Sequence, residues 1–87
     1  MLNSAKRFVY ILRSENNAER RYVGLTADVP ARLNAHNAGQ NTSTTRWRPW
    51  VVDVCVEFRT QAMAIHFEQY LKSGSGHAFA KRHFRNR

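Results

Sequence analysis

The sequence predicts an α+β domain in which a three-stranded antiparallel-type sheet carries helices packed against it, in the order β, β, α, β, α, α. Two apolar segments of strand length flank a short polar turn, a third segment alternates, and two segments carry helix caps and helical spacing. The chain has 87 residues, of which 43% are hydrophobic, enough for one modest core. Residues 1–87 are therefore expected to form a single domain.

The first two strands are predicted as a hairpin. Residues 7–13 contain the run Phe-Val-Tyr-Ile-Leu, whose continuous apolar character predicts a strand buried on both faces. Asn16-Asn17 provides the turn signal, and strand character resumes over residues 21–25. Gly24 lies inside this second strand, which indicates a bulge or the close approach of another backbone or a ligand.

The next segment carries clear helix signals over residues 28–39. Asp28 can cap the helix, Pro30 can occupy its first turn, and Gly39 can end it in the left-handed conformation. Residues 40–45 are polar without periodicity and are predicted to be a loop.

The third strand is expected over residues 51–58, covered on one side. Alternation places one set of side chains on the covered face: Val52, Val54, Val56 and Phe58. Cys55, on the other face, is expected to be packed rather than reactive.

Two further helices follow this strand. Thr60 can cap the first of them, whose apolar residues at helical spacing are expected to pack on the sheet: Met63, Phe67, Tyr70 and Leu71. The Ser-Gly-Ser-Gly segment at 73–76 is predicted to break the helix, and residues 77–84 to form a last short one.

The charge balance points to nucleic acid as the partner. Fourteen Lys and Arg against six Asp and Glu give a net charge of +8, and eleven of the fourteen are arginines, whose planar fork matches phosphate. The alternative is a solvated basic face on a small protein. The basic tail from Lys72 onward also fits a C-terminal helix whose cations favour its own dipole.

Cysteine content and hydropathy address the compartment. Cys55 is the single cysteine, so neither an intrachain disulfide nor a Cys-rich zinc module is expected. A reducing compartment, the cytoplasm, is expected instead. No segment approaches the roughly 20 apolar residues of a membrane span, and no apolar run of a signal peptide opens the chain. Neither membrane insertion nor secretion is expected.

Five polar residues follow one another on this frame. Tyr10 and Tyr22 lie in adjacent strands, Arg32 and His36 share one helical face at a spacing of four, and Glu68 lies on a later helix. With the motifs Val-Tyr-Ile at 9–11 and Tyr-Val-Gly at 22–24, this order resembles the GIY-YIG nuclease domain over nearly the whole chain.

The motifs depart from the family pattern in identifiable places. Residues 9–11 read Val-Tyr-Ile where the family has Gly-Ile-Tyr, and Val23 replaces the isoleucine of the second motif. An asparagine that many members carry some turns after the glutamate is not evident, and Lys72 falls where small members often carry a basic residue.

The resemblance implies a metal-dependent endonuclease that hydrolyses DNA phosphodiester bonds. Glu68 would hold one Mg²⁺ or Mn²⁺ ion, because such ions take one or two carboxylates and keep most of their waters. Arg32 would clamp the scissile phosphate, and His36 would hydrogen-bond a tyrosine or the attacking water. Of the two tyrosines, Tyr10 is favoured as the base, its pKa lowered by Arg32 and the metal, with Tyr22 as the orienting partner.

The same resemblance favours single-stranded DNA, the preference of some small free-standing members, and leaves RNA open. The expected nucleic-acid contacts are Arg46, Trp47, Arg48, Lys72, Lys81 and Arg82. Alternatively, Trp47 and Trp50 seal the start of the third strand. Two other functions stay open: a binding module without catalytic activity, and a structure-specific nuclease subunit that needs a partner.

Overall fold

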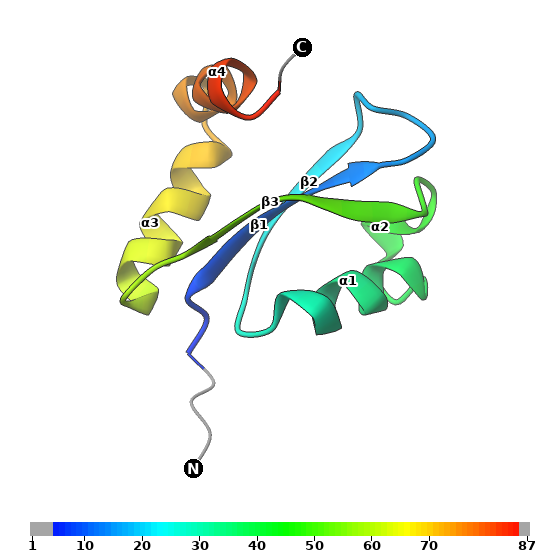
Figure 1. Cartoon of the computed structure of the whole chain (residues 1–87), viewed down its shortest axis with the longest axis horizontal. Helices are drawn as coiled ribbons and strands as arrows, with labels where there is room; N and C mark the ends of the chain where they lie inside the picture. The colour runs from blue at the N-terminus through cyan, green and yellow to red at the C-terminus, as the bar shows by residue number, and fades with distance from the viewer. Residues whose placement is uncertain (1–4, 86–87) are drawn as a thin grey trace.

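The computed structural model describes residues 5–85, which form a sheet between two groups of helices (Figure 1). In chain order the elements are β1 (Phe8–Ser14), β2 (Arg21–Thr26), α1 (Val29–Asn37), α2 (Thr42–Thr45), β3 (Trp50–Glu57), α3 (Gln61–Leu71) and α4 (Gly74–His83). The expected α+β class and element order are confirmed, with α2 as an addition. No helix within residues 5–85 has both the length and the apolar character to cross a membrane.

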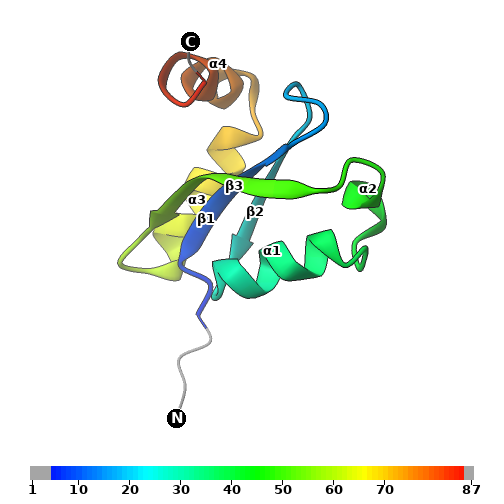
Figure 2. The same cartoon turned by 45° about the vertical axis from the view of Figure 1, so that its right-hand side comes forward.

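The sheet has β1 at its centre, in the order β2-β1-β3, with both pairings antiparallel. Its residues Val9, Tyr10, Ile11 and Leu12 are all buried, as the continuous apolar run predicts. Helices α3 and α4 cover one face of the sheet and α1 covers the other (Figures 1 and 2). Because successive side chains on a strand point to opposite faces, β1 supplies both cores.

Two apolar clusters fill the two faces. Val9 and Ile11 pack with Ala64 and Leu71 on the side of α3 and α4. Tyr10 and Leu12 pack with Trp50 on the side of α1. The alternation along β1 therefore directs the phenol of Tyr10 towards α1.

Helix α1 begins and ends as predicted. The Asp28 side chain accepts a hydrogen bond from the Ala31 amide at 3.1 Å, and Pro30 lies in the first turn. Gly39, just beyond the end of the helix, has φ of 81°, in the left-handed region that favours glycine.

The prediction of a plain loop over residues 40–45 is wrong, because residues 42–45 form the short helix α2. The Asn41 side chain caps it by accepting from the Ser43 amide at 2.9 Å, and the Asn41 carbonyl accepts from the amides of Thr44 and Thr45. These contacts are local and polar, so no apolar periodicity accompanies them.

The predicted faces of the third strand are partly wrong. The pairing of β1 with β3 shifts register between Ile11 and Leu12, which interrupts the alternation of β3. Val52 is 37% exposed, although it was expected on the covered face. Cys55 is exposed rather than packed, on a strand at the edge of the sheet.

Two expectations for the last helices are also corrected. Ala64, Phe67 and Leu71 pack on the sheet, whereas Met63 and Tyr70 are 49% and 39% exposed, because the apolar stripe is narrower than the sequence suggested. The segment 73–76 does end α3, but Ser73 caps α4 and Gly74 to Gly76 form its first turn. Gly76 is buried where a Cβ atom would overlap the Tyr70 carbonyl, so a glycine allows the close crossing of the two helices.

Asn37, the last residue of α1, joins this helix to the start of β3. Its side-chain amide donates to the Trp50 carbonyl at 3.0 Å, and its side-chain oxygen accepts from the Trp50 amide at 2.6 Å. The side chain therefore takes the place of a neighbouring strand at the edge of the sheet.

Replacement of Asn37 by Ala should lower the free energy of unfolding by about 1–3 kcal/mol, because both backbone groups of Trp50 lose their partner in a half-buried place. Urea denaturation followed by Trp fluorescence measures the change. Asn34→Ala is the matched control, since the Asn34 side chain lies exposed on the same helix. Equal stability of the two variants would contradict the prediction.

Candidate active site

A buried tyrosine and a buried histidine lie at the centre of the candidate site. The Tyr10 hydroxyl, from β1, lies 3.1 Å from Nε2 of His36, from α1. Tyr10 is 1% and His36 0% exposed. The ring of Tyr10 lies over Gly24 of β2, where an added Cβ would overlap it. The sequence predicted a bulge or the approach of a backbone or ligand at Gly24, whereas the pairing is regular there and the group that needs the space is the ring of Tyr10.

Arg32 and Tyr22 complete this group. Arg32 lies one turn before His36 on α1, and its guanidinium is close enough to the Tyr10 hydroxyl to favour the ionised phenol. The Tyr22 ring lies 4.7 Å from the His36 ring and 6.2 Å from the Tyr10 ring, between centroids. The structure therefore brings together all four residues that the sequence proposed for catalysis.

Burial decides the protonation of the two central groups. The pKa of Tyr10 is raised, because desolvation outweighs the lowering by Arg32 and by the charge of Lys72. Arg32 acts on this pKa in the expected direction, but the effect of burial is larger. Burial, and then the charge of Arg32, lower the pKa of His36, so its imidazole is neutral at pH 7.

Glu68 comes from α3 and is partly enclosed, with 16% of its side chain exposed. Its carboxylate forms an ion pair of 2.5 Å with Lys72, one turn further along, and the ammonium of Lys72 also acts on the phenol of Tyr10. Within residues 5–85, Glu68 forms no hydrogen bond or ion pair with the tyrosines or Arg32. Lys72 has the smallest of the charge effects on the Tyr10 pKa, after Tyr22 and Arg32.

The donor set around Glu68 fits a single hard cation. No group of three or more His, Cys, Asp and Glu side chains that could hold a metal occurs in the described part of the chain. A cage made entirely of side chains is thus excluded for those residues, whereas an ion that keeps most of its waters needs only one carboxylate. The ion pair with Lys72 shows that this carboxylate already faces a positive charge.

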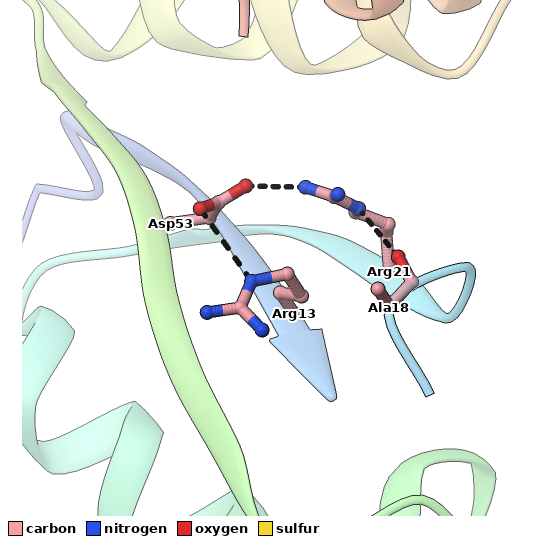
Figure 3. A network of polar contacts seen from close by, with 4 residues as sticks. All are labelled: Arg13, Ala18, Arg21 and Asp53. Carbon is pink, nitrogen blue, oxygen red and sulfur yellow. Dashed lines mark hydrogen bonds and ion pairs between the residues drawn. The ribbon is translucent and has the colours of Figure 1, made fainter. Parts of the chain in front are cut away.

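Asp53, the acidic residue in the middle of β3, has a structural role. It forms ion pairs with Arg13 of β1, at 3.8 Å, and with Arg21 of β2, whose side chain also donates to the Ala18 carbonyl at 3.2 Å (Figure 3). The carboxylate thus links all three strands. The side chains of Arg13 and Arg21 therefore stabilise the sheet rather than serving mainly as phosphate contacts.

The tryptophans expected at the nucleic-acid surface have different environments. Trp50 is buried, and its indole donates to the Thr44 carbonyl at 2.9 Å, which confirms the alternative that it seals the start of the third strand. Trp47 is half-buried, with the guanidinium carbons of Arg20 and Arg46 at 4.3 and 5.1 Å from its ring centroid. Sequence reasoning missed Arg20, which directly precedes the second of the two predicted hairpin strands as part of an Arg-Arg pair.

The remaining basic residues expected to contact nucleic acid are at the surface. Arg48 is exposed and donates to the Thr45 carbonyl at 2.9 Å. Lys81 and Arg82 are exposed in the last turn of α4, the position that also favours the helix dipole. Lys72 is exposed but paired with Glu68.

Thr44 is the polar residue at this site that the sequence did not reveal. It is 1% exposed, and its hydroxyl lies 2.8 Å from Nδ1 of His36. One residue of a polar run, without periodicity around it, carries no signal that distinguishes it from the exposed threonine at 42.

Comparison with known proteins gives one family and several relatives. The GIY-YIG catalytic domain family matches residues 6–82. The UPF0213 protein SH2523 of Staphylococcus haemolyticus is 38% identical over 72 residues, which cover 82% of this chain and 85% of that protein. No solved structure matches the chain significantly.

Two fungal relatives share the name structure-specific endonuclease subunit SLX1. The protein of Candida dubliniensis is 35% identical over 85 residues, and that of Cryptococcus neoformans is 40% identical over 65 residues. These matches cover 90% and 68% of this chain. The chain spans only 28% and 13% of the length of these two relatives.

Proposed function

Because the chain belongs to the GIY-YIG catalytic domain family, we propose that it is a divalent-metal-dependent endonuclease that hydrolyses DNA phosphodiester bonds. The single observation that carries the proposal is the buried hydrogen bond between Tyr10 and His36, with the charge of Arg32 acting on the same phenol. A buried phenol that joins a neutral imidazole and a guanidinium is suited to handling a proton beside a phosphate.

Arg32 is the residue that holds the scissile phosphate. It is half-buried and already directed to the Tyr10 hydroxyl, so a phosphate bound there lies next to the base. Its charge-assisted hydrogen bonds strengthen as negative charge grows on the phosphate oxygens. Tyr22, half-buried against the His36 ring, orients the pair from the side of β2.

Glu68 is the carboxylate that holds Mg²⁺ or Mn²⁺. Supporting this is its position in a half-enclosed place where it already pairs with a cation. When bound, the ion supplies positive charge for the phosphate and the leaving oxygen. With Glu68 on the ion, Lys72 would be free to contact the DNA backbone.

Tyr10 takes the proton of the attacking water. Because only 1% of Tyr10 is exposed, this water is a single molecule admitted with the substrate rather than bulk solvent. The raised pKa keeps Tyr10 protonated at neutral pH, so the phenol needs a group that receives its own proton.

Single-stranded DNA is the substrate that the surface around Trp47 favours. Arg20 and Arg46 cover the ring, and an unpaired base can replace one guanidinium on the ring while that guanidinium moves to a phosphate. A base inside a duplex has no free face for this contact.

Trp47→Ala should weaken binding of single-stranded DNA by about 10-fold, because one base loses its stacking partner. Binding of duplex DNA should change less than twofold, and Trp47→Phe should retain most of the affinity because it keeps an aromatic ring. Fluorescence anisotropy of labelled oligonucleotides at one fixed salt concentration measures the affinities of the parent protein and of both variants for single-stranded and duplex DNA. An equal loss for single strands and duplexes would show that Trp47 does not read unpaired bases.

A second candidate function is that of a structure-specific subunit that needs a partner. The observation in its favour is the similarity to two proteins that are named endonuclease subunits and are several times longer than the matched region. In that case the isolated chain binds DNA and cuts poorly.

The test is a cleavage assay with labelled single-stranded, duplex and branched DNA in Mg²⁺, Mn²⁺ or EDTA. Cutting in either metal, its absence in EDTA and a preference for single strands are expected. Cutting that persists in EDTA contradicts metal dependence. Retention of DNA without cutting in either metal contradicts an autonomous endonuclease and leaves a binding module or a partner-dependent subunit.

A further inference from the structure

Both ring nitrogens of His36 are occupied inside the protein. Nε2 faces the Tyr10 hydroxyl at 3.1 Å, and Nδ1 faces the Thr44 hydroxyl at 2.8 Å. Neutral imidazole carries one proton, so one of these nitrogens donates and the other accepts. The direction of the two hydrogen bonds follows from their other neighbours.

At Thr44, the hydroxyl proton has a partner apart from His36. Oγ1 of Thr44 donates to the Asn41 carbonyl at 3.2 Å, and a carbonyl can only accept. A hydroxyl has a single proton, so with that proton on Asn41 the oxygen accepts from Nδ1–H of His36.

At Tyr10, the same direction follows independently. Arg32, whose guanidinium acts on the Tyr10 phenol, can only donate and so cannot receive the phenol proton. Lys72, the other charged neighbour of the phenol, is also a donor only. Nε2 of His36 is then the acceptor for the phenol proton. If Nε2 itself carried a proton, the buried phenol proton would have no acceptor.

We propose that Thr44 is a positioning residue that fixes His36 as the Nδ1–H tautomer, so that Nε2 receives the proton of Tyr10 during hydrolysis. The inference deepens the proposed nuclease function and rests on it for the catalytic step. The direction of the two hydrogen bonds in the protein without substrate follows from the described contacts alone.

The step balances as two proton transfers along one chain. As the water oxygen forms its bond to phosphorus, one water proton moves to Oη of Tyr10, and the original phenol proton moves to Nε2 of His36. The P–O bond to the leaving oxygen breaks, and that oxygen takes a proton from solvent. The imidazolium afterwards returns its extra proton through Tyr10 to solvent.

The electrostatics of the site support this relay. The lowered pKa of His36 keeps Nε2 free at neutral pH, and the raised pKa of Tyr10 makes a stable phenolate unfavourable. Because the phenol proton moves to His36 while the water proton arrives at Tyr10, no free phenolate forms. The charged or titratable groups around the pair are Tyr22 from β2, Arg32 from α1 and Lys72 beyond α3.

The first measurement needs no substrate. Long-range ¹H–¹⁵N NMR spectra of labelled protein distinguish the protonated from the bare ring nitrogen of each histidine. Replacement of the three exposed histidines, His66, His77 and His83, by Gln assigns the remaining signals to His36. We expect the Nδ1–H tautomer. An Nε2–H tautomer overturns the inference, whatever the cleavage assay gives.

The second measurement compares variants of α2. Thr44→Val should shift His36 away from the pure Nδ1–H form and lower single-turnover cleavage by about 100-fold. Thr44→Ser should keep both the tautomer and the rate. Thr45→Val is the matched control, since the Thr45 hydroxyl bonds Asn41 and Gly39 carbonyls but not His36.

The outcomes separate the two proposals. Thr44→Val that retains the Nδ1–H tautomer and the parent rate overturns the role of Thr44, even if the enzyme is a nuclease. A parent protein that shows the Nδ1–H tautomer but never cuts DNA contradicts the nuclease function and removes the transfer step, while the assigned hydrogen-bond direction stands.

Discussion

Glu68→Gln should reduce cleavage by at least about 1,000-fold while the variant still binds DNA. The substitution keeps the size and polarity of the side chain but removes the charge that would hold the cation, and the lost stabilisation of the transition state amounts to several kcal/mol. Single-turnover cleavage and anisotropy-based binding, each at saturating Mn²⁺, measure the two effects. Binding should be equal or slightly tighter, because one negative charge near the phosphates is gone.

Glu57→Gln provides the matched control for this prediction. Glu57 also pairs with a cation, Arg7, at 3.0 Å, and its replacement also removes one negative charge. Because Glu57 lies on β3 and its partner is not in the site, cleavage should stay at the parent rate. Both variants lose an ion pair in which one partner is about half exposed to solvent, and such pairs contribute at most about 1 kcal/mol of stability. If Glu68→Gln cuts as fast as Glu57→Gln, Glu68 does not serve the reaction.

Gly24→Ala should lower both stability and activity. A Cβ atom at Gly24 would overlap the ring of Tyr10, which is buried and cannot move without displacing His36 and Tyr22. Overpacking of this kind costs about 1–3 kcal/mol, and each kcal/mol lowers the melting temperature of a domain of this size by about 4–8 °C. Displacement of the phenol should also lower cleavage by at least about 100-fold.

Gly74→Ala separates this steric effect from the general effect of replacing glycine. Gly74 opens α4, and no atom lies within 4 Å of a Cβ built on it. Alanine there should leave the melting temperature within about 2 °C of the parent value or raise it slightly. Differential scanning calorimetry compares the two variants, and equal melting temperatures would contradict the close packing of Tyr10 over β2.

The parts of the fold that the sequence predicted depend on local signals. The central position of β1 follows from its continuous apolar run, and α1 follows from Asp28, Pro30 and Gly39. The outward exposure of Val52 could not be predicted, because it results from a register shift between β1 and β3, segments about 40 residues apart. Strand alternation indicates a face only where the pairing is regular.

Some features of the candidate site could likewise be predicted from the sequence, and others could not. The spacing of Arg32 and His36 placed both on one side of α1, and the order of the motifs placed the tyrosines near them. Two physical features required the folded chain. The raised pKa of Tyr10 depends on the water that folding removes, which a count of nearby cations omits. The contact of Thr44 with His36 depends on α2, whose hydrogen bonds leave no apolar pattern.

The central place of β1 has a consequence for the lifetime of the site. Tyr10 is bonded through its strand to neighbours on both sides, β2 at Gly24 and β3 at Cys55. A fluctuation that frays either outer strand leaves the other ladder intact, so the phenol is released only when the domain opens as a whole. The geometry around the reacting proton therefore persists through the small motions that the rim of the molecule undergoes.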